Sequence, residues 1–232
     1  DRAGIQSRTL NTRKGFAVQA LRVQCDRDRY KQAIQELLSE TNIVIKEGEV
    51  VDIVIDQNTI QGVELSTGEK ISAIKTILTT GTFLNGVMFK GKEKISGGRV
   101  GDDSAIPLSK KLYKLKLPMG RLKTGTPARI KLSSINLDVM EEQPGDANPP
   151  PMSALQSPKK TLPQISCYIT RTNKHTHKII SDNTHLSAMY SGQISGIGPR
   201  YCPSIEDKIN KFSEKDSHQI FIEPEGLEKD LV

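Results

Sequence analysis

The chain has 232 residues, of which 35% are hydrophobic and 26% are charged. This composition excludes an intrinsically disordered chain and allows one large domain or two small ones. Lys and Arg number 33 against 27 Asp and Glu, so the net charge of +6 suits a surface that meets phosphates or RNA, although many ordinary soluble proteins are equally basic.

A helix is the first element that the sequence predicts. The basic residues 1–24 show no clear period, whereas apolar side chains recur at helical spacing over residues 27–40. Asp26 is expected to cap this helix, because its carboxylate can accept hydrogen bonds from the first free N–H groups.

The chain begins at Asp1 with no Met and no signal-peptide pattern, and no apolar run approaches the roughly 20 residues that cross a membrane. We therefore expect a cytoplasmic protein whose first part precedes this residue.

Four runs rich in β-branched residues are predicted to follow as strands. They cover residues 43–45, 50–55, 60–65 and 71–78, with turn-forming residues between them. The middle runs predict a β-meander of the kind that some dinucleotide-binding proteins place between core strands of a doubly wound sheet. The last run is expected to return to that sheet, with its C-terminal end toward a ligand.

Glycine-containing loops come next. Thr80, Gly81 and Thr82 follow the last predicted strand, and a glycine there lets the backbone approach a ligand closely, although such a glycine is more often part of a plain turn. Residues 96–99, Ser-Gly-Gly-Arg, can present amides and a guanidinium to an anion. A short helix is predicted over residues 106–115. Residues 120–127 hold two cations, two hydroxyls and two glycines but lack the spacing of a P-loop.

The Pro-rich residues 143–163 predict a long surface connection or flap, and a strand is expected at residues 167–170. His175 and His177 then occur one residue apart. As strand neighbours on one face they can bind a metal, but no third ligand is near, so solvent-facing or RNA-facing imidazoles are favoured and no metal site is predicted. The three cysteines form no C-x-x-C pair, which argues against a zinc site or a disulfide framework.

A dense cluster covers residues 198–208, with a Gly-Pro entry, a Cys-Pro turn and an acidic pair. Ser204 is expected to cap a helix that starts there, and the acidic pair favours the positive end of that helix. Cys202, near the helix start and a cation, is expected to have enhanced thiolate character, and a structural cysteine in a tight turn is the alternative. The chain closes with a strand predicted at residues 218–222.

Taken together and in this order, these clusters resemble the MnmG (GidA) family over nearly the whole chain. The strings that carry the resemblance are residues 10–11, 14–15, 17–18, 80–84, 96–99, 120–127, 198–208 and 223–226. The resemblance implies an α/β fold of the two-dinucleotide-binding flavoprotein type, with a Rossmann-like FAD domain, a β-meander and an inserted α+β NAD-binding domain. Residues 1–128 would then be part of the FAD domain, without its N-terminal Gly-rich βαβ unit. Residues 129–232 would be the inserted NAD-binding region and its return, and a C-terminal helical domain would lie beyond the chain.

The resemblance also implies an enzyme that holds FAD, is reduced by NADH and works as a homodimer with the GTPase MnmE in a heterotetramer. Together they add a carboxymethylaminomethyl or aminomethyl group to carbon five of the wobble uridine of certain tRNAs. Methylenetetrahydrofolate supplies the one-carbon unit, and glycine or ammonium is the other donor. This internal stretch alone is expected to be inactive. Two alternatives stay open: an NAD(P)H-dependent flavin oxidoreductase for a small molecule, and a noncatalytic RNA-binding module, which the 4% aromatic content disfavours.

Residue by residue, the resemblance implies that Val50 and Ala105 contact FAD, although relatives carry Ser at the second position, so only backbone contact remains there. Cys202 is the implied catalytic residue, a nucleophile toward the pyrimidine ring. The implied NAD-binding residues are Gly198, Pro199, Arg200, Tyr201, Cys202, Pro203, Ser204, Ile205, Glu206, Asp207, Lys208, Ile209, Asn210, Lys211 and Phe212. Flavin or substrate anions are expected near Gly81, Thr82, Arg99, Arg121, Lys123 and Arg129.

Overall fold

The computed structural model describes residues 1–154, 162–194, 196 and 204–232. The chain forms two compact units. Unit 1 comprises Asp1–Val44, Thr126–Ile179 and Lys208–Val232, and unit 2 comprises Ile45–Gly125 and Ile180–Asp207. One passage between the units falls close to the boundary predicted at residues 128–129, and the assignment of either range to a FAD or NAD domain stays a prediction.

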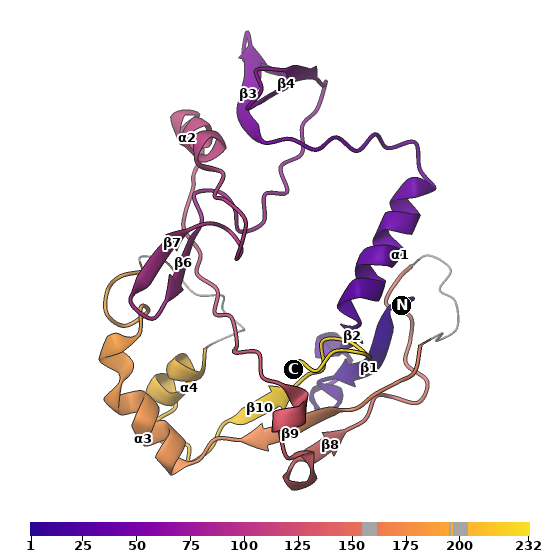
Figure 1. Cartoon of the computed structure of the whole chain (residues 1–232), viewed down its shortest axis with the longest axis vertical. Coiled ribbons are helices and arrows are strands. Elements are labelled where there is room, and N and C mark those ends of the chain that lie inside the picture. The colour runs from indigo at the N-terminus through magenta and orange to yellow at the C-terminus, as the bar shows by residue number, and fades with distance from the viewer. Residues whose placement is uncertain (155–161, 195, 197–203) are drawn as a thin grey trace. The chain divides into compact units, whose positions relative to one another are not determined.

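Unit 1 is built on two antiparallel sheets. The first pairs β1 (Gly4–Leu10) with β2 (Ala20–Cys25), and the second has the order β10-β9-β8 (Figure 1). The strands of the second sheet are β8 (Glu141–Gln143), β9 (Cys167–Arg171) and β10 (Gln219–Ile222). Strands β9 and β10 confirm the two strands predicted there, whereas β1 and β2 lie in a stretch where the sequence showed no period.

Polar residues explain why β1 and β2 escaped prediction. Gln6 is 1% exposed although it is polar, and β2 carries Arg22 and Gln24 among its apolar residues. Burial in this sheet therefore follows hydrogen-bonding partners as well as hydrophobicity. The edge of β1 that does not face β2 also forms backbone hydrogen bonds. The Ser7 carbonyl accepts from the Asp146 amide at 2.8 Å, and the Ile5 carbonyl accepts from the Ile165 amide at 2.9 Å.

Helix α1 (Arg27–Ser39) confirms the first predicted helix and its cap. The Asp26 carboxylate accepts from the amides of Asp28 at 3.1 Å and Arg29 at 3.0 Å, and also from Leu227 at 2.9 Å. Burial alone would raise the pKa of Asp26, but these three backbone hydrogen bonds outweigh it and hold the pKa below its ordinary value. The cap therefore also ties the start of α1 to the C-terminal segment.

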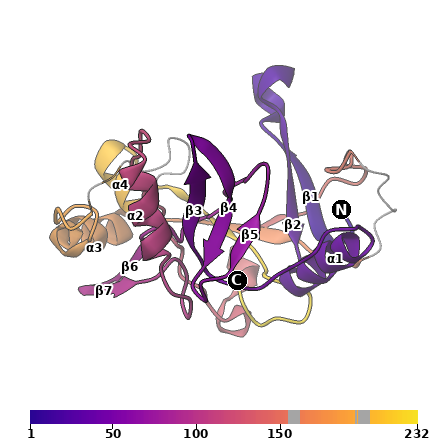
Figure 2. The ribbon, with the colours of Figure 1, turned by 90° about the horizontal axis from the view of Figure 1, so that it is seen from above.

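Unit 2 contains the predicted meander, in which β3 (Val50–Asp56), β4 (Thr59–Leu65) and β5 (Lys70–Ser72) pair in sequence order. Helix α2 (Ile106–Lys114), which was also predicted, lies beside β3 (Figure 2). Leu108 and Leu112 of the helix pack on Ile53 of β3 to form the core. An ion pair from Lys111 Nζ to Asp52 Oδ1, at 2.7 Å, joins the same two elements.

The remaining elements are one hairpin, two helices and several single turns. The hairpin in unit 2 joins β6 (Val87–Lys90) to β7 (Glu93–Ser96), and the chain crosses between the units within α3 (Lys174–Asp182) and α4 (Ile205–Lys211). Single turns of 3-10 helix occur at Thr12–Lys14, Phe16–Val18, Leu132–Ser134, Leu137–Val139 and Thr184–Leu186. Of the described helices, none is both long enough and apolar enough to span a membrane.

Two predictions about local structure are wrong. Residues 43–45 form no strand, and their side chains are exposed. The strand predicted at 71–78 is limited to β5 (Lys70–Ser72), because no described strand pairs with residues 74–78, where Ile74 is 93% exposed. His175 and His177, which the sequence considered as strand neighbours only conditionally, lie in helix α3.

Candidate functional site

The turn at residues 80–86 is the centre of the candidate site in unit 2. The Phe83 amide donates to the Thr80 carbonyl at 3.1 Å, and the Gly86 amide donates to the Phe83 carbonyl at 3.2 Å, so two turns follow one another. Gly81 has φ +54°, a left-handed conformation that favours glycine, and among the described residues a Cβ there would meet only the Phe83 ring, at 3.8 Å. The backbone at Gly81 therefore faces open space.

Residues 96–105 are bonded to this turn at several points. The Thr82 hydroxyl donates to the Gly98 carbonyl at 2.6 Å, and the Gly97 amide donates to the Gly86 carbonyl at 3.0 Å. The Phe83 carbonyl accepts from the Ala105 amide at 2.9 Å. We call the turn at 80–86, the segment 96–105 and Arg121 the loop cluster.

Glycines allow these segments to lie in contact. A Cβ on Gly86 would stand 2.4 Å from the Thr82 carbonyl oxygen, and a Cβ on Gly98 would stand 2.6 Å from the Phe83 ring. Both distances are shorter than real Cβ contacts, so any larger residue would force the segments apart. The predicted loop at residues 96–99 therefore supports the turn at 80–86 through its backbone.

Cations predicted at the site differ in their placement. Arg121 Nη2 donates to the Asn85 carbonyl at 3.1 Å, which brings this guanidinium to the turn. Arg99 is exposed and bridges to Asp102 through its backbone, and Lys123 is half-buried in the same unit. Arg129 lies in unit 1, where it forms an ion pair with Glu225.

The two residues predicted to contact FAD both lie in unit 2. Val50 begins β3 and packs with Leu84 against the cluster of Ile53, Leu108 and Leu112. Ala105 is the N-cap of α2 and makes no side-chain capping bond, so only its backbone is available there. The structure thus places Val50, Thr82, Ala105 and Arg121 in the same unit.

Glu225 is held by two arginines in unit 1. Arg27 Nη1 lies 2.9 Å from Glu225 Oε2, and Arg129 Nε binds the other carboxylate oxygen. Burial by itself would raise the pKa of Glu225, but hydrogen bonds from Arg129 and Arg27 outweigh that effect and lower it below its ordinary value. Arg129 is therefore engaged by a carboxylate in this structure.

Only the second half of the predicted NAD segment can be placed. Residues 197–203, which include Gly198, Pro199, Arg200, Tyr201, Cys202 and Pro203, lie outside the described residues. Ser204 caps α4 as predicted, because its hydroxyl accepts from the Asp207 amide at 3.1 Å while the Asp207 carboxylate accepts from the Ser204 amide at 3.3 Å. Tyr190 donates from its phenol to Asp207 Oδ1 at 3.0 Å.

A partly buried polar network in unit 1 was missed from the sequence. Arg22 Nη1 pairs with Glu223 Oε1 at 2.9 Å, Arg22 Nη2 donates to Gln6 Oε1 and Gln143 Oε1 at 3.1 and 3.0 Å, and the guanidinium lies 5.4 Å from the Phe221 ring centre. Its members come from four separate strands or strand ends, so no local spacing reveals them. The string at residues 223–226, which carried part of the resemblance, was the one available signal.

A second group that sequence reasoning missed joins α3 to the second sheet. The Thr172 hydroxyl lies 2.7 Å from His177 Nε2, and the rings of His177 and His218 stack with centres 5.2 Å apart. Burial lowers the pKa of His218, and the nearby His177, Lys208 and Lys215 add to this effect while Glu214 opposes it. The group therefore favours a neutral His218 and a packed junction.

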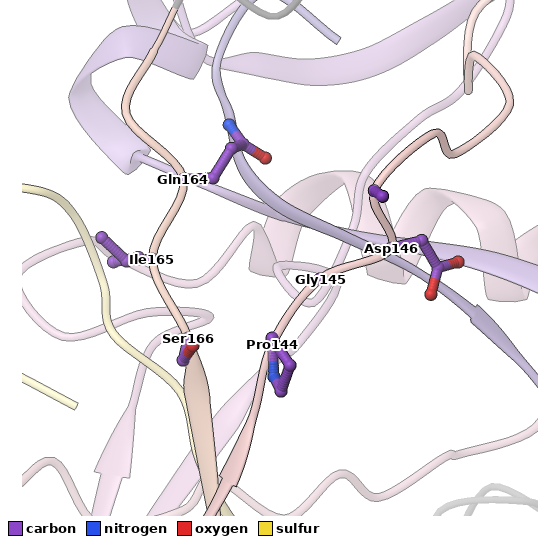
Figure 3. Close-up of a pocket in the computed structure, with 7 residues that line it drawn as sticks. Pro144, Gly145, Asp146, Gln164, Ile165 and Ser166 are labelled. Atoms are coloured by element: carbon purple, nitrogen blue, oxygen red, sulfur yellow. The ribbon is translucent and has the colours of Figure 1, made fainter.

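A cavity of about 370 Å³ lies elsewhere in unit 1, along the edge of β1 (Figure 3). It is lined by Pro144, Gly145, Asp146, Ala147, Gln164, Ile165 and Ser166. Asp146 Oδ2 already accepts from the Thr9 amide at 2.7 Å, and Gln164 Nε2 donates to the Gly4 carbonyl at 2.9 Å. These polar groups tie two chain segments to β1, and none of the predicted site residues lines the cavity.

Comparisons with known proteins bear on the whole arrangement. A family model described as glucose inhibited division protein A (GidA) matches residues 1–232. The form I crystal structure of GidA from Aquifex aeolicus is 44% identical, with a TM-score of 0.88, over 99% of this chain and 39% of that one. The form II crystal structure is 42% identical, with a TM-score of 0.85, over 99% of this chain and 37% of that one. These matches confirm the predicted resemblance and the mixed α/β fold, and they show that the chain spans about two-fifths of the length of those proteins.

Proposed function

The chain belongs to the GidA family, and on that premise we propose that it is part of a flavin-dependent enzyme that modifies tRNA. In this proposal unit 2 supplies one wall of the FAD site. The observation that carries it is the loop cluster, in which a helix start, an open glycine backbone at Gly81 and the Arg121 guanidinium lie together. The rest of the proposal depends on the family.

The residues of the loop cluster fit an anionic dinucleotide. The N-terminus of α2 carries partial positive charge, and no acidic residue lies in its first turn. Gly81 leaves room for a ligand to approach the backbone, and Arg121 and Arg99 bring positive charge to the same unit. Val50 and Ala105 would contact FAD through backbone groups, since neither side chain can form a hydrogen bond. FAD, when bound, supplies the two-electron redox chemistry that NADH renews.

The segment of residues 198–212 is proposed to bind NADH. Its described part is held in place by the reciprocal cap between Ser204 and Asp207, by Tyr190, and by a hydrogen bond from the Ser187 hydroxyl to Glu206 Oε1 at 3.2 Å. A rigid helix start of this kind can orient the residues before it. Cys202 precedes it by two positions and is proposed as the nucleophile that adds to the pyrimidine ring and leaves carbon five enolate-like.

The most specific part of the proposal concerns the product of the reaction and the partner proteins. We propose that the product is wobble uridine with carboxymethylaminomethyl or aminomethyl at carbon five. The proposed partners are MnmE and a second copy of the protein, and the proposed donors are methylenetetrahydrofolate with glycine or ammonium. Membership of the family supports this product and these partners, whereas the geometry of the described residues supports the anion site alone.

Three measurements on one sample of purified full-length protein test the proposal. They are the bound flavin, the oxidation of NADH, and the mass of the wobble nucleoside after incubation with tRNA, MnmE and the donors. We expect bound flavin, NADH oxidation and a wobble uridine of increased mass. Flavin and oxidation with unchanged tRNA would instead favour a small-molecule oxidoreductase, and RNA binding without flavin would favour a noncatalytic module. A Cys202→Ser variant that modifies tRNA at the normal rate would remove the proposed role of that thiol.

A further inference from the structure

Positive charge is concentrated in one segment of unit 2. Residues 86–125 contain ten Lys and Arg but only three Asp and Glu, whereas the whole chain contains 33 and 27. The excess of seven in this segment is larger than the net charge of +6 of the entire chain, so the rest of the chain is close to neutral. A local surplus of this size attracts a polyanion.

Helix α2 presents part of this charge on one face. Leu108, Ser109 and Leu112 are buried, which fixes the face that packs on β3. Lys110 and Lys114 are exposed and lie four residues apart, so they share the opposite side, about 6 Å apart along the axis. In the described chain neither lysine forms an ion pair, whereas Lys111, on the flank, pairs with Asp52.

An exposed aromatic residue lies on the same helix as these two lysines. Tyr113 is 48% exposed and stands three residues after Lys110 and one before Lys114, so its ring borders the same face. The whole chain has five Tyr, five Phe and no Trp, and Tyr113 is one of its exposed rings. Exposed aromatic rings beside cations stack well on unpaired bases.

The β6–β7 hairpin extends the charge. Lys90, Lys92 and Lys94 are exposed around its turn, and Lys94 lies 5.9 Å from the Phe89 ring centre. The base of the hairpin is bonded to the start of α2 through the loop cluster, since Gly86 accepts from Gly97 and Phe83 accepts from Ala105. The hairpin, the proposed flavin wall and the helix are thus parts of one connected structure.

We propose that the outer face of α2, formed by Lys110, Tyr113 and Lys114, binds the RNA substrate. The two ammonium groups contact phosphates, and the Tyr113 ring stacks on an unpaired base. Single-stranded loops expose bases in this way, and a wobble uridine lies in such a loop. The inference rests on the proposed function, because it names the surface on which that enzyme holds its tRNA.

Binding of full-length protein to a labelled anticodon stem-loop RNA, measured over a range of salt concentrations, tests this surface. The double variant K110Q/K114Q should bind several-fold more weakly, and the slope of log affinity against log salt should fall by about 0.7 for each lost phosphate contact. Tyr113→Ala should weaken binding about five-fold or more, whereas Tyr113→Phe keeps the ring and should bind normally. The double variant K110R/K114R should restore both affinity and slope.

A matched control removes the same charge from another part of unit 2. Lys70 and Lys75 are exposed in the meander region, so K70Q/K75Q should leave the salt slope close to that of the wild type. Equal losses in both double variants would show a diffuse charge effect and overturn the assignment to α2. Normal RNA binding by a K110Q/K114Q protein that carries flavin would also overturn the assignment to α2. The proposed function of the enzyme would survive that result. A wild-type protein that carried no flavin and bound no RNA would contradict both the RNA surface and the proposed function.

Discussion

At the scale of single residues, the loop cluster depends on glycines that bring backbone segments into contact. Gly86 and Gly98 are the clearest cases, because their missing side chains make room for Thr82 and Phe83. Gly86 is not among the residues predicted to touch a ligand, and Gly98 supports the turn through its backbone. Their effect on function is expected to be indirect, through the position of the turn that carries Gly81 and Thr82.

Replacement of Gly86 by Ala should destabilise unit 2 by about 1–3 kcal/mol, because the new methyl group would overlap the Thr82 carbonyl and the backbone would have to shift. Chemical denaturation of the full-length protein, followed together with bound flavin, measures both consequences. Gly120→Ala is the matched control, since a Cβ there meets nothing within 4 Å. Equal stability of the two variants would contradict the account of the loop cluster.

Glu225 gives a prediction with a defined pH dependence. Its pKa is lowered in the folded protein by hydrogen bonds from Arg129 and Arg27 acting against burial. The stability that it contributes is therefore fully present above its unfolded-state pKa and is lost as the pH falls through the lowered folded-state pKa. Both arginine side chains are about half exposed, so solvent screening keeps the contribution modest.

Glu225→Gln should lower the free energy of unfolding by about 1 kcal/mol at neutral pH. The difference from the wild type should shrink in acid, where the wild-type carboxylate is protonated as well. Thermal or urea unfolding at a series of pH values measures this, with Glu228→Gln, an exposed carboxylate three residues further on, as the control. A difference that stays constant with pH would mean that the ion pairs are not its source.

At the scale of elements, local signals predicted α1, β3, β4, α2, β9 and β10, because their caps, turns and apolar periods lie within each element. The failures concern elements that depend on distant partners. β1 and β2 bury Gln6 and Arg22 against Gln143 and Glu223, and no short window contains these residues together. Runs such as 43–45 have the composition of a strand, but among described residues no strand pairs with them.

The candidate site shows the same division. Gly81, Thr82, Ser204 and the start of α2 could be located from the sequence, since loops and caps have local signatures. The pairing of Arg129 with Glu225, 96 residues apart, could not. A resemblance to relatives transfers residue positions, but it does not show which cations are already held by carboxylates.

Helix α4 provides a test at this scale. Ser204→Ala removes the hydroxyl that accepts from the Asp207 amide and should cost about 0.5–2 kcal/mol of local stability. Hydrogen exchange of the α4 amides should therefore become faster, while exchange in α2 stays unchanged. Ser213→Ala, just beyond the helix, should have no such effect. Unaltered exchange in the Ser204 variant would show that the cap does not hold the helix start.

At the scale of the whole molecule, the described chain supplies two compact units that together match about two-fifths of the length of the Aquifex GidA structures. The segment richest in positive charge, residues 86–125 of unit 2, also contains residues 96–105 and Arg121 of the loop cluster. The proposed wall of the FAD site at the loop cluster and the proposed RNA surface on α2 thus lie in the same unit. This arrangement suits an enzyme that must bring a flavin and a tRNA base together, which remains our proposal.

Flavin content of a pair of glycine variants tests the central claim most directly. Gly81 and Gly91 have nearly the same backbone conformation, with φ +54° and +57°, but Gly81 lies in the loop cluster and Gly91 at the tip of the β6–β7 turn. Valine is strained equally at both. In full-length protein we expect Gly91→Val to keep the flavin of the wild type and Gly81→Val to lose most of it. Full flavin in both variants would contradict the placement of the cofactor at the loop cluster.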